Sequence, residues 1–390
     1  MTDSNVQAPP LAKLLTHHSE KWRGFDRDVL PLPVAEMDFP IADPIRTVLQ
    51  EMVAQSDLGY LGSVPELAQG FAQFAAVRWN WEVDTSQVSV AADVGVAVVE
   101  VLRVFTKPGD KILINSPVYQ NFYNWIDETH LEKIDVPFAR TGAEEGMSNP
   151  WMLDLDAVEK IYSDGLKVHL LCSPHNPLGR IFSKDELSRI ADMAKKYNVL
   201  VISDEIHAPL TYISSDFTPF LAVSDTAREV GIAVTAASKG WNIAGLKCAI
   251  IVSQNEAINA KLDELPMAVH FRASILGAFA SAAAFADGGV WLDSVMKQLD
   301  HNRHLIRDLL GAKLPTVKYH IPHNSYLAWL DLSTLNLGEN PTATLLEKGR
   351  VAFNPGHSYG LQCSQYVRLN FATSPEIITE AIERILNTLK

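Results

Sequence analysis

The sequence predicts an α/β protein with a mostly parallel central sheet and a smaller α+β lobe. Between about Ser86 and Ser253, short β-branched runs alternate with amphipathic helical stretches, a pattern typical of parallel strands covered by helices. The C-terminal part instead places strands after one long helix. A chain of 390 residues is long enough for a large core and a second lobe.

The first predicted elements are two helices. Asp43-Pro44 starts one of them, because proline is favoured in the first turn of a helix. Apolar residues then follow at helical spacing, namely Ile45, Val48, Leu49, Met52 and Val53. A second helix start follows at Ser63.

Five short runs rich in β-branched residues are the candidate strands of the central sheet. They are Lys111–Asn115, Val168–Cys172, Val199–Ser203, Ile232–Ala236 and Cys248–Val252. Ser183 and Glu186 have the spacing of a capping box, which predicts a helix between the second and third runs. These elements form a predicted βαβ unit.

The C-terminal part predicts the smaller lobe. A long helix through about Asp287–Leu310 precedes strands at Ser325–Asp331 and Tyr366–Phe371 and a closing helix. We expect the N-terminal segment to complete this lobe. The predicted large domain covers residues 49–283, and the predicted small domain combines residues 1–48 and 284–390.

Composition and charge exclude several kinds of partner. The net charge of −13 and the pI near 5.4 oppose binding to phosphate backbones, so we expect no nucleic-acid partner. Three scattered cysteines predict neither disulfides nor a metal site. The first residues lack the apolar stretch of a signal peptide, and the run Ala273–Ala286 is too short to span a bilayer. We therefore expect a cytoplasmic protein without a membrane partner.

Polar side chains follow three successive candidate strands. Asn176 lies in the turn Ser173–Gly179 after one strand, and Asp204 follows the next, with His207 close behind. Lys239 follows a third strand. In a parallel α/β sheet the ligand crevice lies outside the carboxyl ends of the strands, so we expect these side chains to meet there.

These residue types suit pyridoxal 5′-phosphate (PLP), an aldehyde cofactor with a pyridine ring and a phosphate. Lys239 supplies the amine for an imine bond, and an ionised Asp204 keeps the pyridine nitrogen protonated. Asn176 and His207 are candidates to bind the ring oxygen. Tyr119, in the turn after the first candidate strand, is a candidate to stack on the ring.

Other candidates concern the phosphate and the substrate. Asp93 precedes a helix start whose backbone amides suit a phosphate, those of Val94, Gly95 and Val96. Ser238 and Lys247 add a hydroxyl and a positive charge. The guanidinium of Arg368, on a predicted strand, suits a substrate carboxylate. Each residue alone also fits a turn, a helix cap, a core contact or a surface charge, but the ordered set favours a site.

With these residues the chain resembles the fold-type-I PLP enzymes of the aspartate-aminotransferase-like fold. Within them it resembles the MalY/PatB-type cystathionine β-lyases, which are carbon–sulfur lyases of the class I/II aminotransferase superfamily. The resemblance runs through Val34–Pro40, Leu58–Tyr60, Asn115–Tyr119, Ser173–Gly179, Asp204–His207, Ala237–Lys247, Asn354–Gly356 and Arg368–Phe371.

The resemblance implies roles beyond those of the ring-binding residues. It implies a homodimer with shared active sites, in which Tyr60 reaches the phosphate bound by the neighbouring subunit. It also implies that the backbone near Ala35 and the guanidinium of Arg368 receive the substrate carboxylate, with Asn176 beside them. His207 stands where ordinary aminotransferases usually have Tyr, which favours the lyase group. Asp93 departs from the family pattern, because Ser or Thr is expected there.

The predicted reaction is α,β-elimination from L-cystathionine or another L-cysteine S-conjugate, giving a thiol, pyruvate and ammonia. Lys239 removes the Cα proton, and the resemblance places the reaction in methionine biosynthesis. Two alternatives stay open: an aminotransferase on the same scaffold, and a PLP-binding regulatory partner protein. The residues define the reaction type better than the side chain of the substrate.

Overall fold

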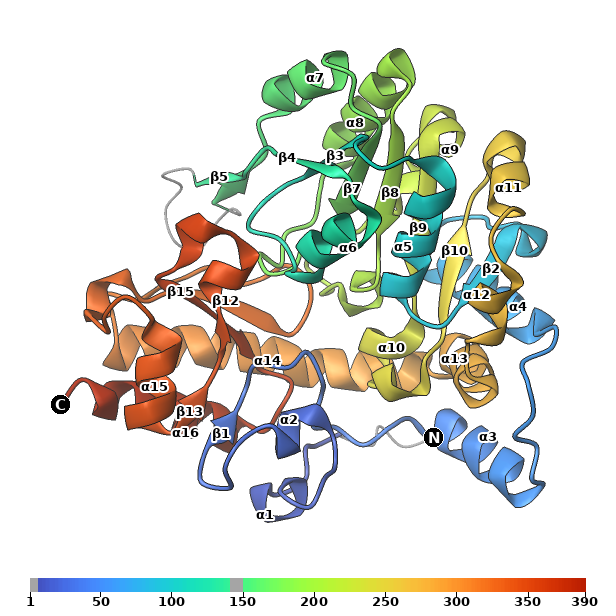
Figure 1. Cartoon of the computed structure of the whole chain (residues 1–390). Helices are drawn as coiled ribbons and strands as arrows, with labels where there is room; N and C mark the ends of the chain where they lie inside the picture. The colour runs from blue at the N-terminus through green and yellow to red at the C-terminus, as the bar shows by residue number, and fades with distance from the viewer. Residues whose placement is uncertain (1–5, 141–149) are drawn as a thin grey trace.

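The computed structural model of the chain describes residues 6–140 and 150–390. Its centre is a seven-stranded sheet (Figure 1). In sheet order, the strands are β2 (Val88–Ala91), β10 (Ala249–Val252), β9 (Gly231–Thr235), β8 (Leu200–Asp204), β7 (Val168–Cys172), β3 (Lys111–Ile114) and β4 (Glu132–Asp135). Only β10 runs antiparallel to its neighbours among these strands, which confirms the predicted mostly parallel sheet.

Helices cover both faces of this sheet. Successive residues of β7 point to opposite faces, so Leu170 and Leu171 belong to two separate apolar clusters. The helices near the sheet are α5 (Val94–Phe105), α6 (Asn121–Thr129), α7 (Leu155–Ser163), α8 (Lys184–Tyr197), α9 (Asp225–Val230), α10 (Ala237–Gly240), α11 (Glu256–Leu262) and α12 (Met267–Phe271). The capping box of α8 is present, because Ser183 and Glu186 each bind the other's backbone amide.

The first helices of the chain agree in part with those predicted from the sequence. The short α1 (Leu11–Leu14) and α2 (Glu20–Arg23) precede α3 (Asp43–Ala54), which starts at the predicted Asp43. The next helix, α4 (Pro65–Trp79), begins later than the predicted start at Ser63. Its N-cap is Val64, whose side chain forms no capping hydrogen bond, and Pro65 occupies the first helical position.

A smaller lobe surrounds a second sheet of four strands. In sheet order these are β11 (Lys318–Tyr319), β12 (Leu327–Asp331), β15 (Tyr366–Asn370) and β14 (Asn354–Pro355). The lobe also contains α15 (Pro341–Gly349) and α16 (Pro375–Thr388). Near the N-terminus, β1 (Leu30–Pro31) pairs in parallel with β13 (Val351–Ala352), so the N-terminal segment contacts the C-terminal lobe. Residues 1–5 of the predicted small domain lie outside the described residues.

A further pair of strands, β5 (Ala139–Arg140) and β6 (Trp151–Met152), lies at the edge of the molecule (Figure 1).

The predicted long helix is preceded by a sharp break at Gly288. Helices α13 (Ile275–Asp287) and α14 (Gly289–Lys313) meet there at an angle of 80°. The indole Nε1 of Trp241 donates to the carbonyl of Gly288 at 3.0 Å. A Cβ at Gly288 would lie 2.4 Å from that same nitrogen, so the break requires glycine.

Within the described residues, no single helix is long and apolar enough to cross a membrane. Taken together, α13 and α14 pass the same test of length and composition, but they are separated by the sharp bend at Gly288.

Candidate active site

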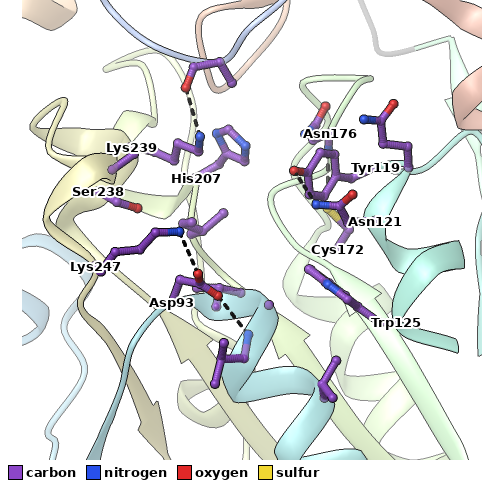
Figure 2. Close-up of a pocket in the computed structure, with 18 of the residues that line it drawn as sticks. Asp93, Tyr119, Asn121, Trp125, Cys172, Asn176, His207, Ser238, Lys239 and Lys247 are labelled. Atoms are coloured by element: carbon purple, nitrogen blue, oxygen red, sulfur yellow. Dashed lines mark hydrogen bonds and ion pairs between the residues drawn. The ribbon is translucent and has the colours of Figure 1, made fainter. Parts of the chain in front are cut away.

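A cavity of about 650 Å³ lies where the carboxyl ends of β7, β8 and β9 face the smaller lobe. Most of the residues proposed from the sequence line it, namely Ala35, Val94, Gly95, Val96, Tyr119, Asn176, His207, Ser238, Lys239, Lys247 and Arg368. Figure 2 shows Lys239, His207 and Lys247 on one wall, with Tyr119 and Asn176 on the other. Two proposed residues, Asp204 and Tyr60, do not line the cavity.

Lys239 is carried by α10, the short helix that follows β9. Its Nζ donates to the carbonyl of Ala35 at 2.9 Å, and the hydroxyl of Tyr326 donates to the same carbonyl at 3.0 Å. Burial, followed by the nearby charge of Arg368, lowers the pKa of Lys239 to about 8. A substantial fraction of this amine is therefore neutral near pH 8, which is the form that attacks a carbonyl carbon.

Asp204 ends β8 and is only 4% exposed. It lies beside Cys172 in the register of β7 and β8, and Cys172 lines the cavity. One carboxylate oxygen accepts a hydrogen bond from the amide of Ile206 at 3.1 Å. Burial raises the pKa of Asp204 to about 7, although this hydrogen bond and the charge of Lys239 oppose the rise. Such a carboxyl group exchanges a proton near neutral pH unless a cationic partner holds it ionised.

Arg368 is the central residue of β15, where it pairs with Trp329 of β12, and it lines the cavity. The side chain is 2% exposed and donates to Asn176 Oδ1 at 3.1 Å and to the carbonyl of Pro33 at 2.8 Å. Among the described residues it forms no ion pair, and its Nε has no hydrogen-bond partner there. Because an uncompensated buried charge is costly, the guanidinium indicates an anionic ligand.

His207 is a neutral imidazole in this site. It is 3% exposed, and burial, with the charges of Lys239 and Arg368, lowers its pKa to about 3. Its ring meets that of Tyr326 edge to face, with centroids 6.4 Å apart. Nδ1 is buried without a hydrogen-bond partner in the described part of the chain. A ligand oxygen or hydroxyl in the cavity would satisfy that nitrogen.

Tyr119 stands on the wall opposite Lys239 (Figure 2). Its hydroxyl accepts a hydrogen bond from Asn121 Nδ2 at 2.9 Å, and its ring lies edge to face with Trp125 at 6.1 Å. Burial raises the pKa of Tyr119, so the phenol stays protonated at neutral pH. A rigid aromatic face is thus available to a ring held by Lys239.

The start of α5 lines the end of the cavity where the sequence predicts the cofactor phosphate, here called the phosphate end. Asp93 caps this helix, because Oδ1 accepts from the amide of Val96 at 2.8 Å. Its other oxygen pairs with Lys247 Nζ at 2.9 Å. A Cβ at Gly95 would lie 3.1 Å from atoms of the Trp125 indole, so glycine lets this ring lie against the helix start. Here the predicted cation, Lys247, already has a carboxylate partner.

The structure adds lining residues that the sequence did not identify as ligands. They include Asn121, Cys172, Arg272 and Asn354. Trp125, which the sequence offers with Trp241 as a candidate to line the pocket, also lines the cavity. Asn121 and Trp125 lie one helical turn apart on α6, directly after Tyr119, so helical spacing was the available signal. Trp241, another candidate for the pocket, is fully buried against Gly288 and does not line the cavity.

Tyr60 lies on the surface, between α3 and α4. Its side chain is 88% exposed, and it is absent from the cavity of its own chain. His270 Nε2 lies 3.1 Å from the carbonyl of Gly62, which ties this segment to α12 near the cavity mouth. This position suits a contact with another molecule rather than with the chain's own cavity.

The donor set fits PLP. An amine of lowered pKa, a neutral imidazole and an amide line one cavity, and a buried carboxyl group lies beside the lining residue Cys172. A helix start lies at its other end, at Val94. The Nδ1 of His207 and the Nε of Arg368 have no hydrogen-bond partner in the described part of the chain, and a bound molecule would supply one.

Comparisons with known proteins agree with this chemistry. The family model "Aminotransferase class I and II" matches residues 27–385. Cystathionine beta-lyase of Corynebacterium glutamicum is 34% identical, over 98% of this chain and 100% of that protein. Cystathionine beta-lyase PatB of Bacillus subtilis is 30% identical, over 92% of each chain.

A solved structure is similar over its whole length. Cystalysin from Treponema denticola, which contains pyridoxal 5′-phosphate, superposes with a TM-score of 0.91 at 28% identity. The match covers 100% of this chain and 99% of that one. These comparisons confirm the expected family and the aspartate-aminotransferase-like fold.

Proposed function

We propose that this chain, which belongs to the aminotransferase class I and II family, is a PLP-dependent carbon–sulfur β-lyase. Its substrate is L-cystathionine or another L-cysteine S-conjugate, and its products are a thiol, pyruvate and ammonia. The observation that carries the proposal is the buried guanidinium of Arg368, which has no ion-pair partner in the described chain and shares one cavity with Lys239. The cystathionine β-lyase names of two relatives support it.

Several residues would hold the cofactor. Lys239 is the covalent anchor, Asp204 the partner of the pyridine nitrogen, and Asn176 and His207 the partners of the ring oxygen. Bound PLP supplies an electron sink for the charge left when the substrate loses its Cα proton. An ionised Asp204 keeps that sink effective, because its negative charge stabilises the protonated pyridine nitrogen. Tyr119 packs against the ring.

Lys239 moves the proton. With the cofactor bound and its own amine free, Lys239 would act as the base that removes the proton from the substrate Cα. Its lowered pKa, about 8, matches this task, because a general base works best when its pKa lies near the working pH. The leaving group at Cβ is then the thiolate of a thiol with a pKa of ~8.5. It departs far more readily than the hydroxide of a hydroxyl substrate, because water has a pKa of ~15.7.

Arg368 orients the substrate. Its guanidinium presents a planar fork to a carboxylate, and Asn176 Oδ1 and the carbonyl of Pro33 already hold that fork in place. The backbone near Ala35 forms the adjacent wall of the cavity. Holding the carboxylate here fixes Cα relative to Lys239, which is the positioning that elimination requires.

The lyase is favoured over an aminotransferase by His207, which stands where ordinary aminotransferases usually have Tyr, and by the names of the relatives. Incubating the PLP-loaded protein with L-cystathionine, with and without a 2-oxo acid, tests this choice. Pyruvate, ammonia and thiol in equal amounts without the 2-oxo acid support the lyase. Turnover only when a 2-oxo acid is added indicates an aminotransferase, and no turnover with PLP bound indicates the regulatory partner.

The assembly that we propose is a homodimer with shared active sites. The exposed Tyr60 would reach the phosphate end of the neighbouring cavity, and other exposed apolar residues occur in its own segment and on α12, which contacts that segment through His270 and Gly62. These include Leu58, at 54% exposed, and Met267 and Phe271 of α12, at 74% and 47%. On the family resemblance, we also place the enzyme in the cytoplasm and in methionine biosynthesis.

A further inference from the structure

The phosphate end of the cavity contains a carboxylate in an unusual place. Asp93 sits directly before α5 and uses both oxygens there. One accepts a hydrogen bond from the amide of Val96, and the other pairs with Lys247 (Figure 2). The side chains of Asp93 and Lys247 are 39% and 58% exposed, so both remain accessible to an incoming ligand.

These two contacts occupy hydrogen-bond donors that a bound phosphate would otherwise use. A phosphate monoester carries about −1.5 to −2 charges at neutral pH and binds through charge-assisted hydrogen bonds. The Asp93–Lys247 pair is electrically neutral, so it offers no net positive charge to that dianion. Of the first-turn amides, the one of Val96 is already occupied, which leaves those of Val94 and Gly95.

We propose that Asp93 competes with the cofactor phosphate for Lys247 and for the amide of Val96. Asp93 thereby weakens the hold on the phosphate and makes the cofactor more readily exchangeable than the rest of the site allows. The proposal rests on the proposed PLP site but concerns phosphate affinity alone. The competing explanation is that Asp93 only caps α5.

The test is a titration of the cofactor-free protein with PLP and, separately, with pyridoxal, which lacks the phosphate. Binding is followed by the visible absorption of the bound cofactor and by quenching of tryptophan fluorescence. In Asp93→Asn the side-chain oxygen still caps the helix, but the negative charge is gone. We expect the Kd for PLP to fall by about tenfold, because removing one half-exposed charge contact changes binding by about that factor. The Kd for pyridoxal should stay unchanged.

A matched control is available at the start of α7. Asp154 caps α7 in the same way, through the amides of Asp156 and Ala157, and does not line the cavity. Asp154→Asn should leave both Kd values at the wild-type level. Asp93→Ser, which also keeps a capping oxygen, should reproduce the tighter PLP binding and guards against a folding defect of the first variant.

Lys247→Gln tests the competition itself. If Lys247 is shared between Asp93 and the phosphate, its removal should weaken PLP binding more in the Asp93→Asn background than in the wild type. Equal losses in the two backgrounds, or an unchanged PLP Kd in both Asp93 variants, would overturn the proposal while leaving the PLP site intact. If the wild-type protein binds no PLP, the proposed function itself fails.

Discussion

The charge state of side chains is set differently at the two ends of the cavity, the ring end near Lys239 and the phosphate end at the start of α5. At the ring end, Asp204, Asn176, His207 and Arg368 are at most 5% exposed, and burial shifts the pKa of Asp204 up and that of His207 down. At the phosphate end, charges are half exposed and neutralise each other by pairing. Substitutions at the ring end should therefore change proton chemistry, whereas those at the phosphate end should change cofactor affinity.

The largest expected effect is at Lys239. Lys239→Ala should reduce turnover of L-cystathionine by at least ~10⁴-fold, because the covalent anchor and the base are lost together. It should also abolish the visible absorption that the lysine-bound cofactor gives. The measurement is pyruvate release together with an absorption spectrum of the PLP-loaded protein. Retention of both signals would remove Lys239 from the site.

Asp204→Asn should lower turnover on the order of 10²–10³-fold while PLP still binds. The neutral amide no longer stabilises a protonated pyridine nitrogen, and each pKa unit lost there corresponds to ~1.4 kcal/mol. Glu205→Gln is the matched control, because Glu205 is also buried but binds Ser203 and the amide of Phe220 instead. We expect that control to lower the melting temperature with near-normal turnover per bound PLP. The reverse pattern would contradict the assignment.

Arg368→Lys should raise the KM for L-cystathionine by about tenfold to a hundredfold, with a smaller change in kcat. Lysine keeps the charge but lacks the planar fork that binds a carboxylate through two hydrogen bonds. Steady-state kinetics with L-cystathionine measure the effect. A matching amine without the α-carboxylate should bind both proteins equally, and an unchanged KM would show that the carboxylate binds elsewhere.

Cofactor capture should depend on pH through Lys239. The neutral amine reacts with the aldehyde, so the capture rate should rise with pH and reach its half-maximum near 8, where the pKa lies. An ordinary lysine would give a midpoint near ~10.4. Stopped-flow absorption across pH 6–10 measures this. Arg368→Gln should move the midpoint upward, because a neighbouring positive charge that lowers the pKa of Lys239 is removed.

The smallest expected signal concerns the shared dimer. Mixed protomers of Tyr60→Ala and Lys239→Ala should recover activity, because one of the two sites in a mixed dimer would contain both intact residues. With random pairing, up to about a quarter of wild-type activity returns. Sedimentation confirms the assembly of the mixed sample. A fully active monomer at low concentration would exclude the shared site.

Sequence reasoning identified the buried end of the cavity because parallel strands end at one edge. Asn176, Asp204 and Lys239 each follow a strand, and strand topology alone brings them together. The sequence could not show that Asp204 lies behind the cavity lining rather than in it. Its neighbours Cys172 and Ile206 line the cavity instead, a detail of side-chain placement that strand order does not predict.

The phosphate end was less accessible to sequence reasoning. The contact between Asp93 and Lys247 joins residues 154 positions apart, and no periodic pattern predicts such a pair. The edge strands were also missed: β4, Glu132–Asp135, is short, charged and largely exposed, so it lacks the apolar run of a central strand. The role of Gly95 likewise depends on Trp125, which approaches it from another helix.

The break at Gly288 has a mechanical consequence for catalysis. Trp241, which holds the joint between α13 and α14, also follows the C-terminus of α10, the helix that carries Lys239. The turn that carries Lys239 and the bend between α13 and α14 are therefore both connected to one residue, Trp241. A displacement of this bend would act directly on Trp241 and, through it, on the end of the helix that carries Lys239.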